Sequence, residues 1–320
     1  MIRSLLAAPA VGLALGLLSA SPSAAAPIAT SVLAPALGAD AEQEKSSDEI
    51  ERATEWPDAP GREALTKTLA KIKKATTDEM ARQGAEEIKA AGAGAAPALL
   101  RALGKERDKD ARKRLIAALD SITRPEHTRL LAKEFKSKKE PTQAYVLRRA
   151  AELGDAGLKD DAMGLWKGLV AMRANPRKKD KVDDDHERRV AILLMSCGST
   201  ESLTLVLELS GSKSFTSWRK HLQAAAECAK TAGPDVGNAI AAAMTKAKGR
   251  REQLGTLRLL TYAGSKEHAR SVAPGLDSND NNVKIAAINA LRRLVDGDDP
   301  IEKLSTFDAI ERANKWKARL

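Results

Sequence analysis

The chain has 320 residues, a formal net charge of +10 and an aromatic content of only 3%. Alanine and leucine supply most of the apolar volume, which suits close packing of helices better than a β-core rich in valine, isoleucine, tyrosine and phenylalanine. The composition therefore argues against a β-rich fold and predicts an all-α protein.

Residues 1–26 have the features of a signal peptide. Arg3 is followed by an apolar run over residues 5–18 and by a stretch of small residues, 19–26, that offers cleavage sites. The run is short for a membrane span, and no second apolar segment of about 20 residues follows. We expect a cleaved signal peptide, a secreted or periplasmic location and no stable membrane insertion. An uncleaved N-terminal anchor is the alternative.

Residues 27–60 are first rich in alanine and proline and then acidic. Residues 40–58 hold eight carboxylates against two basic side chains. Few large apolar groups interrupt them, so the sequence predicts a disordered acidic linker. Trp56 is the exception, and we expect it to dock on the folded part. The linker could also cover a basic surface of its own chain, because a tether raises the effective concentration of such a segment; a solvated spacer is the alternative.

From residue 61 onward, apolar helix-like stretches repeatedly close on glycine. Glycine tolerates the left-handed backbone that ends many helices, so these positions predict repeated helix stops. A period of about 30–45 residues with helical content is typical of stacked helical hairpins. The glycines are Gly154, Gly198, Gly233, Gly264 and Gly297.

The last hairpin is the clearest one. The sequence predicts an apolar first helix over residues 266–276, an Asp- and Asn-rich turn, and a second helix over residues 283–294. The same layout occurs 172 residues earlier. The matching apolar positions, spaced by three or four residues on one helix face, are Ala111, Leu115, Ala118, Leu119 and Ile122 in the earlier copy and Val283, Ala287, Ala290, Leu291 and Leu294 in the later one.

These two hairpins resemble the HEAT-repeat family, including its shorter variant in phycobilisome lyase-like proteins. The resemblance extends over about residues 62–297, with residues 301–320 as a closing helix. It implies that residues 61–320 form a right-handed α-solenoid whose second helices line a concave face. The motif says little about chemistry.

A charged insertion, residues 173–187, contains Asn-Pro and cannot be helical throughout. Its acidic end, residues 183–187, could hold a divalent ion weakly, but a helix cap explains it as well. The turn with Asp277, Asn279 and Asn281 resembles a calcium loop without its glycine and its bidentate glutamate, so we interpret it as a capping turn. We expect no metal site and no cofactor.

Cys197 and Cys228 are 31 residues apart, close to one repeat. In an oxidising compartment they could form a disulfide across neighbouring repeats. The two cysteines lie at different positions relative to the glycine that ends each helix. This difference favours a distance between their α-carbons that exceeds the reach of a disulfide. Two free buried thiols and a disulfide both remain possible interpretations of the sequence.

Residues 61–320 carry a net charge of +15, and their basic residues recur as pairs on the expected second helices. Stacked repeats would align these pairs into a basic stripe. Such a stripe would attract an anionic protein segment or an anionic polymer. The alternatives are an internal ladder of Arg–Asp pairs or a merely solvated face. The insertion bases Arg177, Lys178 and Lys179 would add to one rim. Our candidate binding residues are Arg148, Arg149, Arg188, Arg189, Arg219, Lys220, Arg250 and Arg251.

Other functions have little support in the sequence. Nucleic-acid binding by base stacking needs exposed rings along a groove, and the few aromatic residues are scattered. The four histidines share no local motif, and no nucleophile elbow, zinc-protease motif or phosphate loop is present. We therefore expect a non-enzymatic binding or scaffold protein. The alternatives are a structural spacer without a ligand, or an enzyme or enzyme subunit with a site between repeats.

Overall fold

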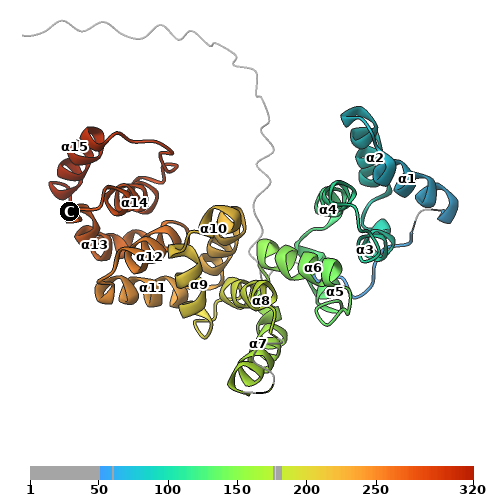
Figure 1. Ribbon diagram of the computed structural model, residues 1–320, viewed down its shortest axis with the longest axis horizontal. Coiled ribbons are helices and arrows are strands. Elements are labelled where there is room, and N and C mark those ends of the chain that lie inside the picture. Colours follow the sequence, from blue (N-terminus) through green and yellow to red (C-terminus); the bar gives the residue numbers. More distant parts are fainter. Residues whose placement is uncertain (1–50, 60, 176, 178–181) are drawn as a thin grey trace, which may run out of the picture. The chain divides into compact units, whose positions relative to one another are not determined.

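The computed structural model describes residues 51–59, 61–175, 177 and 182–320 (Figure 1). Within these ranges the chain forms fifteen α-helices and several short helical turns, with no β-strand, so the all-α prediction is confirmed for this part. The expected signal peptide, the linker up to residue 50, and Lys178 and Lys179 of the insertion lie outside the described residues. No helix in the described ranges combines the length and the apolar character that a membrane crossing requires.

From α1 to α14 each odd-numbered helix is shorter than the one that follows it, except α7, which has 16 residues against 13 in α8. In the first half, the 3₁₀ turns η1 (Ala93–Ala95), η2 (Pro125–His127) and η3 (Ala156–Leu158) lead into helices α3, α5 and α7. The bounds of the helices in this half are α1 Arg62–Lys74, α2 Asp78–Ala91, α3 Ala96–Leu103, α4 Lys109–Ile122, α5 Thr128–Ala132, α6 Glu140–Leu153 and α7 Lys159–Ala174.

The second half continues the alternation. The turn η5 (Lys266–His268) precedes α13, the turn η6 (Ala273–Asp277) follows it, and one π-helical turn, η7 (Arg292–Asp296), extends α14. The helix bounds are α8 Asp184–Ser196, α9 Leu203–Gly211, α10 Phe215–Ala232, α11 Asp235–Lys246, α12 Arg250–Ala263, α13 Ala269–Val272, α14 Asn281–Leu291 and α15 Thr306–Lys317.

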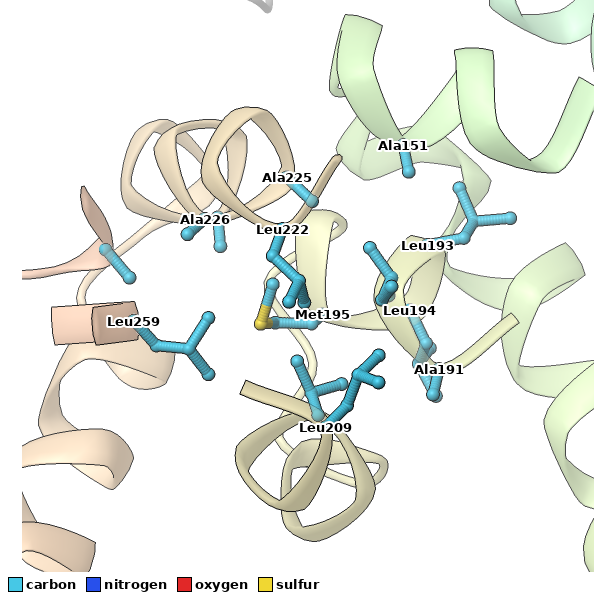
Figure 2. Close-up of a cluster of buried hydrophobic side chains, with 14 of the residues drawn as sticks. Ala151, Ala191, Leu193, Leu194, Met195, Leu209, Leu222, Ala225, Ala226 and Leu259 are labelled. Atoms are coloured by element: carbon cyan, nitrogen blue, oxygen red, sulfur yellow. The ribbon is translucent and has the colours of Figure 1, made fainter. Parts of the chain in front are cut away.

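We call α4, α6, α8, α10, α12 and α14 the second helices. From α6 onward each one packs on the next, and α15 packs on α14. The intervening helices α9 and α11 both pack on α12. Figure 2 shows one region of the core, where leucine, alanine and methionine side chains of α8, α9, α10 and α12 meet. Leu193, Leu194, Met195, Leu209, Leu222, Ala225, Ala226 and Leu259 are all buried there.

Helices α4 and α14 confirm the predicted apolar faces. All ten matching positions on these two helices are buried. Asp108 caps α4 by accepting from the backbone N–H of Ala111, and Asp280 caps α14 by accepting from Asn282 and Val283. The turn that resembles a calcium loop is therefore a helix cap, although Asp280 and not Asp277 supplies the oxygen.

Four of the five predicted glycine stops have a left-handed backbone: Gly154, Gly198, Gly233 and Gly297 have φ between 61° and 141°. Gly264 also ends its helix, α12, but with a φ of −86°, so the left-handed backbone is absent there. A Cβ there would lie 2.6 Å from the Leu260 carbonyl oxygen and 2.8 Å from Leu294 Cδ2. Close packing, and not backbone conformation, explains this glycine.

The two cysteines are free thiols. Cys197 Sγ donates to the carbonyl of Asp155, and Cys228 Sγ donates to the carbonyl of Glu152, each over 3.4 Å. Both thiols thus contact the turn that ends α6. Burial raises the pKa of Cys197 to about 12 and that of Cys228 to about 11, so both stay protonated and unreactive at neutral pH.

Residues 51–59, which we call the N-terminal strap, form no helix but contact the helices that follow. The Trp56 ring stacks on His127 with 5.3 Å between ring centroids, which confirms the expected docking of this residue. The backbone N–H of Ala53 donates to the Glu126 carbonyl over 2.9 Å. A Cβ on Gly94 would lie 2.3 Å from the Asp58 carbonyl oxygen, so the strap passes directly over this glycine.

Candidate functional site

The predicted basic pairs do lie on the second helices, one pair on each, with the last pair on the π-helical turn that extends α14. The structure does not gather them into one site. Instead they fall into three environments: a half-buried polar network, exposed ion pairs, and the walls of two grooves.

Arg148 and Arg149 belong to a half-buried network between α4 and α6. Arg148 donates to Asp120 over 2.8 Å and to Glu152 over 2.6 Å. Arg149 donates to the hydroxyl and the carbonyl of Thr123 over 2.9 Å and 2.7 Å. Burial disfavours the charge of Arg148, but the two carboxylates outweigh it and raise the pKa of Arg148. The internal-ladder interpretation therefore describes this pair, with Asp120 of α4 as the aspartate partner of Arg148.

Arg189 lies at the edge of the same region, on α8. Its guanidinium lies 5.8 Å from the centroid of the Trp218 ring and 3.6 Å from Glu140. Trp218 in turn packs at a tilt on His221, with 6.0 Å between ring centroids. Arg189 thus links α8 to α10 and is engaged with the protein itself.

His221 is buried, and neither of its ring nitrogens has a hydrogen-bond partner among the described residues. Its Nδ1 lies 3.6 Å from Glu152 Oε1, which is longer than a hydrogen bond, so Glu152 acts on it through charge. Burial outweighs this attraction and lowers the pKa of His221. The imidazole is therefore neutral at pH 7.

The other candidate residues are more exposed. Arg188 pairs with Asp185 over 2.7 Å and Arg250 with Asp280 over 2.6 Å, while Arg219 lies 3.9 Å from Glu302. Such exposed pairs contribute little to stability. Lys220 and Arg251 are exposed and have no ion pair within the described part of the chain.

Arg188 and Arg251 line a groove of about 670 Å³ between α9 and α11. Leu205, Leu207 and Leu209 form part of its apolar lining, and Lys246 also reaches it. Its carboxylates, Glu208 and Glu252, offset most of the positive charge. This groove is therefore largely apolar and nearly balanced in charge.

A second groove, of about 420 Å³, lies on the second helices themselves, and we call it the second-helix groove. Its walls come from α10, α12, α14 and residues 300–302. Arg219 is the one candidate residue that reaches it. Its apolar lining includes Leu254, Ile285 and Ala286, and its polar lining includes Gln223, Arg258, Tyr262, Asn282 and Asn289.

Two side-chain amides fix the walls of this groove. Asn289 on α14 donates to the Ile301 carbonyl over 3.1 Å and accepts from the Ile301 N–H over 2.8 Å, so it holds residues 300–302 in place. Gln223 on α10 donates to the Tyr262 hydroxyl on α12 over 2.7 Å. The groove is thus a preformed feature of the packed helices.

Arg258 is the most informative residue of the groove. Its guanidinium stacks 4.0 Å from the centroid of the Phe215 ring and donates to the Ser210 carbonyl over 2.6 Å. Within the described residues it has no carboxylate partner. Burial, and then the nearby charge of Arg250, lower the pKa of Arg258. An anion entering the groove would relieve this uncompensated charge.

Sequence reasoning missed Arg258 because it considered pairs of basic residues, and Arg258 stands alone in a stretch of leucines. The available signal was the eight-residue spacing from Arg250, which is a little over two helical turns. Only the packing of α10 on α12 places Arg258 in the same groove as Arg219.

The described residues contain no group of three or more histidine, cysteine, aspartate or glutamate side chains that could hold a metal ion. Asp183, at the acidic end of the insertion, caps α8 by accepting from Asp185 and His186. His127 and His268 accept backbone N–H groups at the starts of η2 and η5, over 3.0 Å and 2.9 Å.

The second-helix groove offers positive charge and hydrogen-bonding groups, which suit binding. Comparison with protein-family models, with curated proteins and with solved structures gave no match.

Proposed function

We propose that this chain is a non-enzymatic binding module whose second-helix groove holds an acidic segment of another protein. The observation that carries the proposal is Arg258, a half-buried cation without a carboxylate partner in the described chain. A carboxylate supplied by a partner would form a charge-assisted hydrogen bond with it, which is stronger than a bond between neutral groups.

Arg219 provides a second point of attachment at the same groove. Its contact with Glu302 spans 3.9 Å, and the two side chains are 49% and 82% exposed. An ion pair this exposed is worth at most about 1 kcal/mol, so an incoming carboxylate can replace Glu302. Arginine suits this role because its planar guanidinium binds a carboxylate through two donors.

The apolar lining argues for a protein segment over a simple anion. Leu254, Ile285 and Ala286 would contact aliphatic side chains, while Asn282 would bond to the backbone of the partner. Binding sites of this kind combine apolar contact with a few well-placed polar groups. An anionic polymer without apolar groups would use only half of the groove.

We also propose that the helices form a right-handed α-solenoid of the HEAT type. The alternation of short and long helices supports this arrangement, as does the packing of each second helix on the next from α6 to α14. In such a solenoid the second helices form a continuous surface for extended partners. The features of residues 1–26 support export of the chain to meet its partner outside the cytoplasm.

The test uses a substitution that should stabilise helix α14 but weaken the binding of an acidic ligand. Asn282 lies in the first turn of α14 and lines the groove. Replacing it with aspartate puts a negative charge where the helix dipole stabilises it, yet it repels an acidic ligand. Asn281→Asp is the matched control, since Asn281 is the preceding residue and does not line the groove.

Binding would be measured by fluorescence anisotropy with a labelled acidic peptide of alternating glutamate and leucine, at low and at high salt. We expect Asn282→Asp and Arg219→Glu to weaken binding at least fivefold, whereas Asn281→Asp and Lys220→Glu change it less than twofold. Equal affinity in all four variants would overturn the proposal. An acidic polysaccharide that competes as well as the peptide would identify the partner as a polymer instead.

A further inference from the structure

A small cavity of about 140 Å³ lies between the π-helical turn η7 and helix α15, at the C-terminal end of the described chain. It shares no lining residue with the second-helix groove. A water molecule takes up about 30 Å³ in the liquid, so the cavity has room for about five heavy atoms. Its six lining residues are Arg292, Asp296, Arg312, Lys315, Trp316 and Arg319.

Four of these six side chains are cationic and only Asp296 is anionic. Arg312, Lys315 and Arg319 follow one another at spacings of three and four residues, so they lie on one side of α15 and of the turn that follows it. An adjacent side of α15 buries Ala309, Ala313 and Trp316, and α15 packs on α14. Trp316 belongs both to the buried side and to the cavity lining, so the core contact of α15 places the adjoining basic side at the cavity.

The counter-ions of these four cations are weak or missing. Arg319 donates to both oxygens of Asp296, over 2.7 Å and 3.1 Å, and stacks 4.1 Å from the centroid of the Trp316 ring. The Arg312 side chain has no ion pair or hydrogen bond within the described residues. Outside the lining, Arg292 pairs with Asp298 over 3.0 Å and Lys315 with Glu311 over 2.6 Å.

All three of these ion pairs are solvent-exposed to a substantial degree on at least one side. Exposed pairs contribute little, so a ligand of higher charge can displace them. A dianion that reaches four cations at once gains more than any of the single carboxylates that it replaces.

The backbone at the cavity is also unusual. Arg292–Asp296 is a π-helical turn, a rare conformation that is frequent at functional sites. The N–H groups of Gly297 and Asp298 both bond to the Arg292 carbonyl, and Gly297 has a left-handed φ of 75°. This turn presents Arg292 and Asp296 to the same cavity.

We propose that this cavity binds a tetrahedral dianion, either inorganic phosphate or the phosphate group of a monoester. The two terminal arginines of the set, Arg312 and Arg319, supply planar forks that match phosphate oxygens, and Lys315 adds a point charge. In the absence of the ligand Asp296 pairs with Arg319, so Asp296 competes with the ligand for this arginine. The site is independent of the second-helix groove, so either proposal can fail without the other.

Isothermal titration calorimetry of the full chain with inorganic phosphate and with methyl phosphate, in low-chloride buffer, tests this proposal. We expect saturable binding to one site. Arg312→Gln should weaken it at least fivefold, while the matched control Lys317→Gln should change it less than twofold. Lys317 lies on the same helix and carries the same charge, but it pairs with Asp277 and does not line the cavity.

Asp296→Asn provides a readout of opposite sign. It frees Arg319 and removes a repulsive carboxylate, so we expect phosphate to bind at least threefold more tightly. Asp277→Asn adds the same charge elsewhere and should have no such effect. Comparable binding of methyl phosphate and inorganic phosphate would identify a phosphorylated partner, and binding of inorganic phosphate alone would identify the free ion.

Two results would overturn the proposal. One is the absence of saturable binding with either probe. The other is an equal loss of affinity in Arg312→Gln and Lys317→Gln, since this would reflect net charge and not a site. Because both positions are exposed, neither substitution should unfold the chain, and unchanged circular dichroism would verify this. Asn282→Asp, which alters the second-helix groove, should leave phosphate binding unchanged.

Discussion

Arg52 and Asp155 form an ion pair across 103 residues of sequence. The Arg52 Nε and Nη2 donate to the two carboxylate oxygens of Asp155, over 2.9 Å and 3.2 Å. Asp155 is only 4% exposed and also accepts from the Thr128 hydroxyl and from the backbone N–H of Gly157. One carboxylate therefore ties the N-terminal strap to α5 and η3.

This contact predicts a large stability effect at a position that lines neither groove. Removing one partner of a buried ion pair leaves the other uncompensated, which costs roughly 3 kcal/mol. We expect Asp155→Asn and Arg52→Gln to lower the free energy of unfolding by about this amount in urea titrations. Glu51→Gln, at the exposed neighbouring residue, should change it by less than about 0.5 kcal/mol. Similar values for Glu51→Gln and Arg52→Gln would show that the strap does not support the fold.

The Arg148–Arg149 network predicts that charge reversal here acts on folding and not only on binding. Arg148→Glu with Arg149→Glu would place four carboxylates around α4 and α6, counting Asp120 and Glu152. We expect this double variant to lose cooperative unfolding and helicity, as followed by circular dichroism. Arg188→Glu, which breaks only an exposed pair with Asp185, should keep both. If the double variant stays folded and loses only affinity for anions, the network is a binding surface and not a structural one.

His221 predicts a pH dependence of stability. Its ring faces Glu152 and Arg148 from α6, Arg189 from α8 and Trp218 from its own helix. Because burial lowers its pKa in the folded state, the unfolded chain binds a proton near pH 6.5 while the folded chain does not. Protons thus favour unfolding, so stability is lost as pH falls below about 6.5.

The pKa values of His127 and His186 are lowered by burial as well, so they act in the same direction. We expect the free energy of unfolding to fall between pH 7 and pH 5, and His221→Phe to flatten this profile while keeping the contact with Trp218. The measurement is a series of urea titrations at half-unit pH steps. An unchanged slope in His221→Phe would mean that His221 does not drive the dependence.

The sequence predicted the parts of the fold that depend on neighbouring residues. Helix periodicity is local, so the apolar positions of α4 and α14 could be assigned from spacing alone, and all ten are buried. Left-handed glycine stops and aspartate caps are also local, which is why Gly154, Gly198, Gly233 and Gly297 were predicted correctly. Gly264 ends α12 as predicted but without a left-handed backbone, and part of its constraint comes from Leu294, which belongs to a different segment.

Of the candidate site, the sequence predicted basic pairs on the second helices, and this placement is what the structure has. It could not predict which of these charges are already compensated, because Asp120 and Asp280 reach Arg148 and Arg250 only through packing between helices. For the same reason Arg258, a single arginine in an apolar stretch, was not predicted.

The sequence by itself thus determined the helical class, the helix ends marked by glycine and the excess of positive charge, because these depend on composition and on residues a few positions apart. The tertiary structure decided which cations are neutralised and which line a groove. Arg148 lies 2.8 Å from a carboxylate, whereas Arg258 contacts an aromatic ring and a carbonyl. Electrostatic compensation depends on distances of a few ångströms between distant segments, and only the packed helices set those distances.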